Sequence, residues 1–484
     1  MILRELLHEV PVIQEVGSLD VEVRDICFDS RQVKEGSLFV AVKGVHTDGH
    51  IYIDKVIEAN AAVVIVEELP QQTSENVTYI LVNDSSFSLG KVASNFYGNP
   101  SNELRLVGVT GTNGKTTVAT LLFNLFDKLG YHVGLLSTVE NKIGPLIIPA
   151  THTTPDPIAL NKLLRQMVDD GCDYCFMEVS SHAVVQQRIA GLQFCGAIFT
   201  NITHDHLDFH GTFDSYIKAK KKFFDDLNKS AFALTNNDDR NGSIMLQNTK
   251  AHTKSYGLQS AADFKAKVVE SHFDGMLLNI DGHEVWVKLV GGFNAYNILA
   301  VYGAAISLEQ ETLKVLTALS EITGAEGRFE TIRSSNGIVG IVDYAHTPDA
   351  VENVLVTINN LRNPGQQIIT VLGCGGDRDK TKRPEMASIA LKYSDKLIIT
   401  SDNPRTEDPV EIIKDMEEGV SPEKKKYTFS ITDRREAIRA ACHLANPGDV
   451  VLVAGKGHEK YQEIKGIRHH FDDKEELEKT FKEQ

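Results

Sequence analysis

The sequence predicts an α/β protein of three domains. Short apolar runs alternate with segments of helical periodicity along most of the 484 residues, a pattern typical of parallel sheets covered by helices. A chain of this length suggests about three domains. Turn-rich stretches at 98–102 and 324–327 separate them, so we expect domains at 1–100, 101–326 and 327–484.

The composition favours a soluble enzyme of the cytoplasm. The net charge of −16 disfavours nucleic acid and anionic membranes as partners. The charged N-terminus, 1–10, resembles neither a signal peptide nor an anchor, and no run reaches transmembrane length. Six irregularly spaced cysteines predict reduced thiols, and we expect the CxxC pair Cys172 and Cys175 to lie in the core.

The first domain is expected to be small and α/β. Its β-rich runs cover 21–28, 37–42 and 62–66, and a helix is expected at 54–60. The segment 29–31 (DSR) follows the first run and offers a hydroxyl and a guanidinium, which suit a phosphorylated or polar ligand. A plain turn is an equally good interpretation.

The central domain opens on a phosphate-binding loop. An apolar strand at 104–109 leads into the glycine turn GTNGKTT at 111–117, and a periodic helix follows. Backbone N–H groups at such a helix start favour phosphate, Lys115 would reach the outer phosphates, and Thr116 would bind magnesium. Val109 stands where the strict P-loop pattern has glycine, so this loop is a variant. The loop predicts that the protein binds a nucleoside triphosphate.

Further strands of this domain end in acid and hydroxyl residues. The expected parallel strands cover 132–137, 174–179, 197–201 and 231–235. Because the carboxyl ends of parallel strands form the ligand crevice, these groups should converge with the P-loop. Glu178 is the natural magnesium ligand there. The nearby histidines could suggest zinc, but no cysteine or third histidine has the spacing of a structural site.

A lysine-rich helix is expected over 213–227. At 100° per residue Lys220 shares an arc with the aromatic residues of this helix, whereas Lys218, Lys221 and Lys222 are expected on a solvated face. Burial favours a neutral amine, which can act as a nucleophile or react with carbon dioxide to give a carbamate. A carbamate would add a carboxylate that could bind magnesium.

After a meander with Asp-Gly turns, the segment GGFNAYN leads into an Ala-rich helix with two amides on one face.

The third domain is expected to be Rossmann-like. Its four apolar strands end in polar signatures that would form a second crevice on one sheet edge: DYAH from 343, GCGGDRD from 373, DNPR from 402 and GKGHE from 455. The glycines of GCGG lack the spacing and the acid of a dinucleotide fingerprint, so nicotinamide binding is discounted.

Together these motifs resemble the Mur ligase family, the ATP-dependent amino-acid ligases of peptidoglycan synthesis. The resemblance spans nearly the whole chain through GTNGKTT, MEVSSHAVVQQR, NITHDHLDFH, GGFNAYN, DYAHTPDA, GGDRDKTKRPEM, DNPR and GKGHE. It implies an N-terminal UDP-substrate domain, a central ATP domain and a C-terminal amino-acid domain. It also implies that the enzyme adds the third residue of the stem peptide to UDP-N-acetylmuramoyl-L-alanyl-D-glutamate. Members with DNPR resemble meso-diaminopimelate ligases, and lysine-adding relatives lack this arginine.

The resemblance assigns a role to each site residue. Lys115, Lys220, His206 and Glu178 are expected to be catalytic, with Lys220 carbamoylated, and Thr116, Glu178, His206 and Lys220 to serve Mg²⁺. ATP would contact Gly111, Thr112, Asn113, Gly114, Lys115, Thr116, Thr117, Asn294 and Arg328. The muramoyl dipeptide would contact Ser30, Thr153, Thr154, Ser180, Gln186 and Arg188. Diaminopimelate would contact Arg383, Asp402, Asn403, Pro404, Arg405, Gly455 and Glu459.

The implied chemistry is formation of an acyl phosphate on the D-glutamyl γ-carboxylate, followed by attack of an amine. We expect only small-molecule partners and a monomer. The alternatives are the L-lysine-adding ligase, a folylpolyglutamate synthetase, a P-loop motor or switch, and a non-catalytic nucleotide-binding scaffold.

Overall fold

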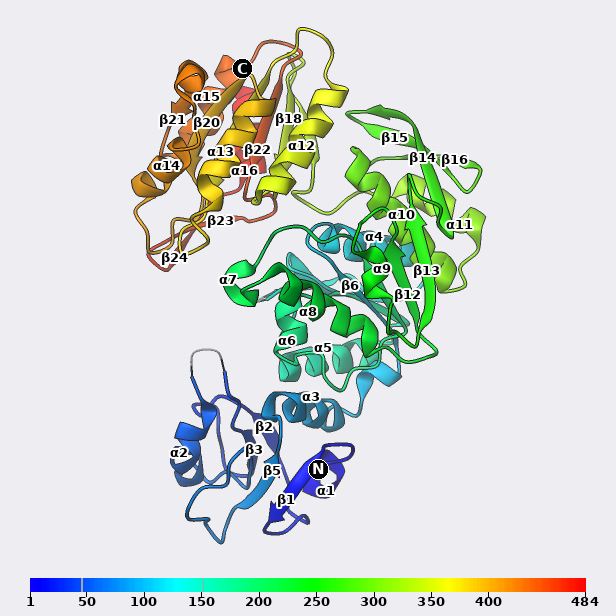
Figure 1. Ribbon diagram of the computed structural model, residues 1–484, viewed down its shortest axis with the longest axis vertical. Helices are drawn as coiled ribbons and strands as arrows, with labels where there is room; N and C mark the ends of the chain where they lie inside the picture. The colour runs from blue at the N-terminus through cyan, green and yellow to red at the C-terminus, as the bar shows by residue number, and fades with distance from the viewer. Residues whose placement is uncertain (45–46, 151) are drawn as a thin grey trace.

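The computed structural model describes residues 1–44, 47–150 and 152–484. Within them, three α/β units follow one another along the long axis of the molecule, with the N-terminal unit at the bottom of Figure 1 and the C-terminal unit at the top. This architecture confirms the predicted fold class. Among the described residues, no helix is long and apolar enough to cross a membrane.

The N-terminal unit is a five-stranded sheet of order β1-β5-β4-β3-β2, with β1 antiparallel and the rest parallel. The first predicted strand is shorter than expected, because residues 21–24 contribute only an isolated bridge between Glu22 and Ile2. Helix α3 lies between this sheet and the central unit (Figure 1). The elements are α1 (Leu3–Leu6), β1 (Val12–Val16), β2 (Asp25–Cys27), β3 (Ser37–Val40), α2 (Ile53–Glu58), β4 (Val63–Val66), β5 (Thr78–Val82) and α3 (Ser85–Phe96).

The central unit has an eleven-stranded sheet of order β16-β15-β14-β13-β12-β11-β6-β10-β7-β8-β9. Its middle strands are parallel, and antiparallel hairpins extend it at both ends. The elements are β6 (Arg105–Thr110), α4 (Lys115–Lys128), β7 (Val133–Leu136), β8 (Glu140–Ile143), β9 (Leu146–Pro149), α5 (Pro157–Asp169), β10 (Tyr174–Glu178), α6 (Ser181–Val185), β11 (Gly196–Phe199), α7 (Leu207–His210), α8 (Phe213–Asp225), β12 (Phe232–Asn236), α9 (Gly242–Met245), β13 (His252–Gly257), β14 (Phe264–His272), β15 (Gly275–Ile280), β16 (His283–Val287), α10 (Gly292–Ser307) and α11 (Thr312–Glu321).

The C-terminal unit has a six-stranded sheet of order β17-β18-β22-β19-β20-β21, parallel except for β17, and a separate two-stranded hairpin. The elements are β17 (Glu330–Arg333), β18 (Val339–Asp343), α12 (Pro348–Leu361), β19 (Ile368–Cys374), α13 (Lys382–Tyr393), β20 (Lys396–Ser401), α14 (Pro409–Glu417), β21 (Thr428–Ser430), α15 (Arg434–Leu444), β22 (Val450–Ala454), β23 (Tyr461–Ile464), β24 (Ile467–His470) and α16 (Asp473–Glu483).

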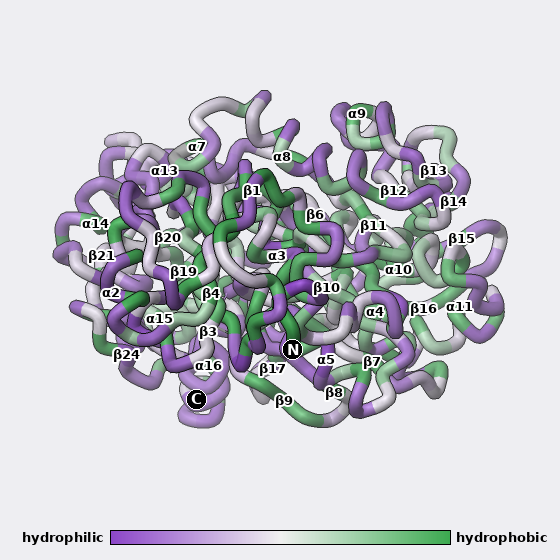
Figure 2. Tube along the Cα trace, turned by 90° about the horizontal axis from the view of Figure 1, so that it is seen from below, coloured by the Kyte–Doolittle hydropathy of each residue, from purple (hydrophilic) through white to green (hydrophobic). Residues whose placement is uncertain are grey.

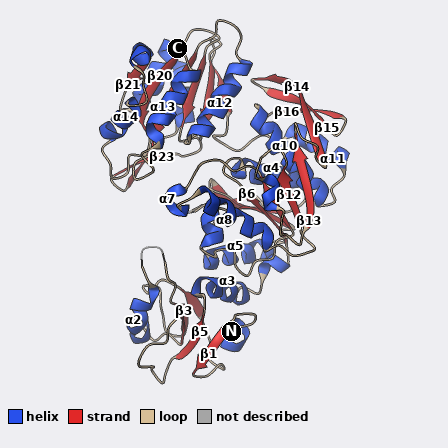
Figure 3. Cartoon of the chain, in the orientation of Figure 1, coloured by secondary structure: helices blue, strands red, loops and turns tan. Residues whose placement is uncertain are grey.

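Buried side chains fill both faces of the central sheet. Along β10, Tyr174 and Phe176 join the core that packs on α4 and α10, whereas Cys175 and Met177 join the core that packs on α5 and α8. The alternation follows from the two-residue period of a strand. Helices lie on both sides of the central and C-terminal strands in Figure 3, and hydrophobic and hydrophilic stretches alternate along the chain in Figure 2.

Candidate active site

The phosphate-binding loop joins the carboxyl end of β6 to the start of α4. Gly111 has φ 153° and Gly114 has φ 86°, conformations that L side chains rarely adopt. A Cβ atom at Gly111 would lie 1.9 Å from Thr200 Oγ1, and one at Gly114 would lie 2.6 Å from Asn297 Oδ1. Only glycine therefore fits at these two positions, and the loop takes the strand-turn-helix form that the sequence predicts.

The side-chain amino groups of two lysines converge on one carbonyl oxygen of this loop. Lys115 Nζ donates to Gly111 O at 3.0 Å and to Thr112 O at 2.8 Å, and Lys220 Nζ donates to Gly111 O at 2.7 Å. Lys220 is 1% exposed, with Nζ 4.7 Å from the centroid of the Tyr216 ring. Burial, followed by repulsion from Lys115, holds the pKa of Lys220 well below its usual value. The inward orientation predicted for Lys220 is confirmed.

One of the three lysines predicted to lie on a solvated face of α8 is buried instead. Lys221 is also buried, and its ammonium group donates to Asp225 Oδ1 and Oδ2 at 2.5 and 2.8 Å. Helix α9 packs against α8, and the ion pair of Lys221 to Asp225, one turn further along α8, satisfies its charge. Lys218 and Lys222 form exposed pairs of the same i,i+4 kind.

Glu178 ends β10 with a fully buried side chain. Its Oε1 accepts from the N–H of Thr138 at 2.7 Å, and its Oε2 accepts from the Thr138 hydroxyl at 3.2 Å. The register that pairs Glu178 with Val109 places it beside the P-loop. The carboxyl ends of these strands therefore meet as predicted.

A cavity of about 410 Å³ is lined by all four predicted catalytic residues. Thr116, Glu178, His206 and Lys220 all line it, together with Lys115. Carboxylate and hydroxyl oxygens are the ligands that magnesium prefers, and Glu178 and Thr116 offer them, whereas His206 and the unmodified Lys220 offer nitrogen. His206 has a left-handed backbone, φ 54°, and its ring lies at right angles to that of His182, with centroids 4.9 Å apart.

The residues predicted for the muramoyl dipeptide form a hydrogen-bonded group beside Glu178. Thr154 donates to the carbonyl of Glu178 at 2.8 Å, and its own carbonyl accepts from Arg188 Nη1 at 2.7 Å. Gln186 Oε1 accepts from the Arg188 guanidinium, and Ser180 caps α6. Thr153, Thr154, Ser180 and Arg188 line the same cavity, whereas Gln186 lies behind Arg188 and is not among the lining residues.

Ser30 lies apart from this group, in a turn of the N-terminal unit after β2. Its neighbour Arg31 pairs with Asp29, with Nη2 2.7 Å from Oδ2. That guanidinium and its hydrogen bonds lower the pKa of the Asp29 carboxyl to about 2.

A second cavity, of about 350 Å³, borders the P-loop on its other side. Asn113, Gly114, Thr117 and Arg328 line it, as does Asn297. Asn294, the amide chosen from the sequence, is buried: its Nδ2 donates to Val290 O at 2.8 Å, and its Oδ1 accepts from Asn297 Nδ2 at 3.0 Å. Asn294 thus positions Asn297, and the latter faces the cavity.

A third cavity, of about 440 Å³, contains the polar ends of the C-terminal strands. Asp402, Asn403, Arg405, Gly455 and Glu459 line it, as the sequence predicts for residues that share one sheet edge. Arg405 Nη1 donates to Gly376 O at 2.8 Å. Glu459 Oε2 accepts from Asn403 Nδ2 at 2.7 Å and from Lys456 Nζ at 3.2 Å. Burial, with the nearby Asp402 carboxylate, raises the pKa of Glu459.

Arg383 and Pro404 are not among the residues that line this cavity. The guanidinium of Arg383 is fully buried and pairs with Glu407 and Asp415, at 2.9 and 2.7 Å. It also donates to Gly375 O at 3.2 Å. Arg383 therefore stabilises the loop after β19 and does not face the cavity.

The three cavities adjoin one another between the central and C-terminal units. His206, Tyr344 and His346 line both the cavity at Glu178 and the one at Arg405. Asn113, Gly114 and Arg328 line both the cavity at Glu178 and the one at Asn297. The P-loop thus lies at the centre of one continuous cleft.

The sequence patterns gave no individual role to several residues that line the cleft. Asp205, Tyr344, His346 and Asp349 line the cleft, and Asn113 Nδ2 donates to Asp349 Oδ2 at 2.9 Å between the two units. These residues belong to the motifs NITHDHLDFH and DYAHTPDA at the ends of strands β11 and β18, and that position was the sequence signal for a place in the cleft.

The fold, the P-loop and the cleft define a nucleotide-binding α/β protein. The middle domain of the Mur ligases matches residues 109–305, their glutamate ligase domain matches 327–457, and the Mur ligase family, catalytic domain, matches 22–99. The chain belongs to the Mur ligase family. It is an ATP-dependent ligase that forms amide bonds.

Curated relatives match along the whole chain. The chain is 58% identical to a UDP-N-acetylmuramoyl-L-alanyl-D-glutamate--2,6-diaminopimelate ligase of Phocaeicola vulgatus and 56% identical to that of Bacteroides fragilis, with 99% of each chain covered in both cases. A solved structure of a ligase with this name has a TM-score of 0.71 at 31% identity, covering 100% of this chain and 99% of the other. A Thermotoga maritima MurF ligase solved with ADP shares the fold, with a TM-score of 0.62 at 21% identity over 96% of this chain and 98% of the other.

Proposed function

We propose that this protein joins meso-diaminopimelate to the D-glutamyl γ-carboxylate of UDP-N-acetylmuramoyl-L-alanyl-D-glutamate at the expense of ATP. The observation that carries the proposal is the single cleft that brings the P-loop, the buried Glu178 and Lys220, and the pocket of Arg405 and Glu459 together. Two relatives that match this chain along 99% of their length are named as 2,6-diaminopimelate ligases of this kind.

The P-loop side of the cleft activates the acid. A carboxylate resists attack by an amine, so the γ-phosphoryl group of ATP is first transferred to it, giving an acyl phosphate. Lys115 holds the outer phosphates, and the N–H groups at the start of α4 face them. Arg328 reaches this region, since its Nη2 lies 3.2 Å from Thr116 Oγ1, and it would contact the phosphates too.

The C-terminal side supplies the amine. Diaminopimelate carries a second carboxylate that lysine lacks, and a guanidinium can grip a carboxylate through two parallel hydrogen bonds. Arg405 takes this role, and Glu459 and Asp402 face ammonium groups of the substrate. The amine attacks the acyl phosphate, and inorganic phosphate leaves.

Thr116, Glu178, His206 and a carbamoylated Lys220 would hold Mg²⁺. When bound, the ion supplies positive charge to the phosphate oxygens during transfer. The neutral amine that carbamoylation requires is favoured by the burial of Lys220 and by its proximity to Lys115.

The remaining assignments are also proposals. Ser30 would contact the uridine nucleotide, while Thr153, Thr154, Ser180, Gln186 and Arg188 would hold the muramoyl dipeptide. We place the domain boundaries at 100/101 and 326/327, and the enzyme in the cytoplasm as a monomer.

A coupled assay of phosphate release tests this function. Release should require both the muramoyl dipeptide nucleotide and an amino acid, and it should be faster with meso-diaminopimelate than with L-lysine. Faster turnover with lysine would overturn the substrate assignment. Phosphate release independent of both substrates would indicate an ATPase, and an absence of release would indicate a scaffold.

A further inference from the structure

Three potential metal ligands meet at the edge of the central sheet that lies opposite the cleft. His132 immediately precedes β7, and Asp170 and Cys172 lie in the loop between α5 and β10. Strands β7 and β10 are parallel neighbours, with Val133 paired to Tyr174, so these residues gather at the amino ends of the strands. The catalytic residues lie at the carboxyl ends, and the proposed ligase mechanism uses none of this group.

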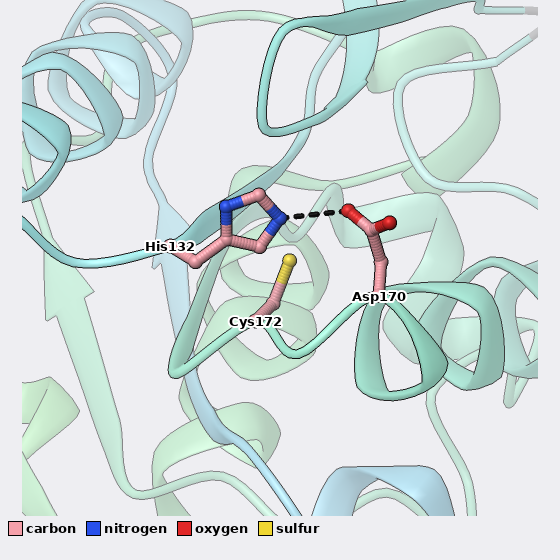
Figure 4. A group of neighbouring side chains, drawn as sticks. All are labelled: His132, Asp170 and Cys172. Atoms are coloured by element: carbon pink, nitrogen blue, oxygen red, sulfur yellow. Dashed lines mark hydrogen bonds and ion pairs between the residues drawn. The ribbon is translucent and has the colours of Figure 1, made fainter.

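The three side chains point toward one another (Figure 4). His132 Nε2 lies 2.7 Å from Asp170 Oδ2, and one ligand atom from each of the three residues lies within 4.8 Å of the other two. The Cys172 side chain is buried, whereas those of His132 and Asp170 are 37% and 55% exposed. Solvent can therefore reach the group from the side of His132 and Asp170, while the sulfur atom of Cys172 lies on the buried side.

The backbone around the group is fixed by hydrogen bonds. The N–H of His132 donates to Asp173 Oδ2 at 3.1 Å, and the N–H of Asp173 donates to His132 O at 2.8 Å. The N–H of Cys172 donates to Met167 O at 2.9 Å. Gly144 lies directly against the His132 ring, because a Cβ there would be 2.5 Å from Cε1.

The donor set is that of a transition metal. One imidazole nitrogen, one thiolate sulfur and one carboxylate oxygen suit tetrahedral Zn²⁺, with water in the fourth position. Metal–ligand bonds of about 2.0–2.3 Å place ligand atoms roughly 3.4 Å apart, so the present separations, which run up to 4.8 Å, need only small adjustments. Asp170 and Asp173 make the loop acidic, which favours a cation.

We propose that His132, Asp170 and Cys172 form a second metal site, which binds a thiophilic divalent cation of the Zn²⁺ class and ties the start of β7 to the loop before β10. The sulfur–metal bond forms as the Cys172 thiol releases its proton to solvent. The site is independent of the magnesium site proposed in the cleft, which offers oxygen and nitrogen ligands but no sulfur.

Titration of the full-length chain with Co²⁺ in place of Zn²⁺ tests this site. We expect a near-ultraviolet thiolate-to-cobalt absorption band, removed by addition of Zn²⁺. The band should be lost in Cys172→Ala and kept in Cys175→Ala, a matched control on the same CxxC pair whose sulfur lies in the core. Co²⁺ bound at the proposed magnesium site gives no such band, because no cysteine is among the residues that line the cavity at Glu178. Cys374 lines the adjoining cavity at Arg405, so Cys374→Ala should also keep the band.

The zinc affinity of Asp170→Asn gives a second test. Asp170 is the most exposed of the three ligands, so this variant should fold normally. Loss of a second-shell partner already costs about 10–100-fold in affinity, so loss of a ligand should cost at least tenfold. Ligase activity of Asp170→Asn should be unchanged. The proposal is overturned if the wild-type chain gives no band, if the band survives in Cys172→Ala, or if Asp170→Asn binds zinc as tightly as wild type.

Discussion

Lys220 shows how strongly the surroundings of one residue control its chemistry. A lysine on the surface is a cation at neutral pH, but Lys220 is 1% exposed and lies beside a second ammonium group. Both effects favour the neutral amine, the form that reacts with carbon dioxide.

We therefore expect Lys220→Ala to lower kcat about 100-fold or more, since a charged group at the reacting phosphates is lost. Steady-state phosphate release measures the effect. Lys221→Ala is a matched control, because Lys221 is also buried on α8 but pairs with Asp225 away from the P-loop. Bicarbonate should raise the activity of the wild-type enzyme prepared free of carbon dioxide. Full activity of Lys220→Ala, with no response to bicarbonate, would make this lysine structural.

Arg405 is the residue on which the choice of amino acid depends. Arg405→Ala should raise the KM for diaminopimelate about 30- to 1,000-fold, equivalent to about 2–4 kcal/mol for a buried carboxylate left without its partner. The KM for ATP should not change. Arg405→Lys keeps the charge but loses the planar fork, and it should recover only part of the affinity. An unchanged KM in both variants would place the second carboxylate elsewhere.

At the scale of elements, Arg383 connects α13 to α14. Its guanidinium pairs with Glu407 in the turn before α14 and with Asp415 inside it. Hydrogen bonds from Arg383 are the largest cause that lowers the pKa of Glu407 to about 2. The unfolded chain therefore binds more protons than the folded chain between about pH 4.5 and pH 2.

The stability that Glu407 contributes should be complete above about pH 4.5 and should be lost as the pH falls toward 2. Glu407→Gln should reduce the free energy of unfolding at pH 7 by about 1–3 kcal/mol and flatten its decline in acid. Denaturant unfolding across this pH range measures both effects. Glu411→Gln, on the exposed face of α14, should leave the profile unchanged. Equal pH profiles for wild type and Glu407→Gln would refute this account.

The sequence predicted elements well where the signal was local. Periodicity identified Lys220 as inward, and strand ends indicated the crevice residues Glu178 and Arg405. It could not distinguish Asn294 from Asn297, because both lie on one face of α10 and only packing against the P-loop separates them. The partners of Arg383 lie 24 and 32 residues away, so no local pattern indicated its ion pairs.

At the scale of the whole molecule, the cleft lies between two units that touch through few polar contacts at the P-loop. Asn113 reaches Asp349, and Arg328 reaches Thr116. An acyl phosphate is vulnerable to water, so the C-terminal unit is expected to close over the central unit during the reaction.

Solution scattering tests this closure. The radius of gyration should fall when a non-hydrolysable ATP analogue and the dipeptide nucleotide are added together. Lys115→Ala should show a smaller change, because it weakens the hold on the outer phosphates. Identical scattering curves with and without the ligands would count against closure.

The carbonyl oxygen of Gly111 couples two equilibria, since it accepts hydrogen bonds from both Lys115 and Lys220. A phosphate that draws Lys115 away from this oxygen changes the proton affinity of Lys220. By reciprocity, conversion of the neutral Lys220 amine to an anionic carbamate changes the affinity of the loop for that phosphate. Nucleotide binding and the charge state of Lys220 are therefore thermodynamically linked.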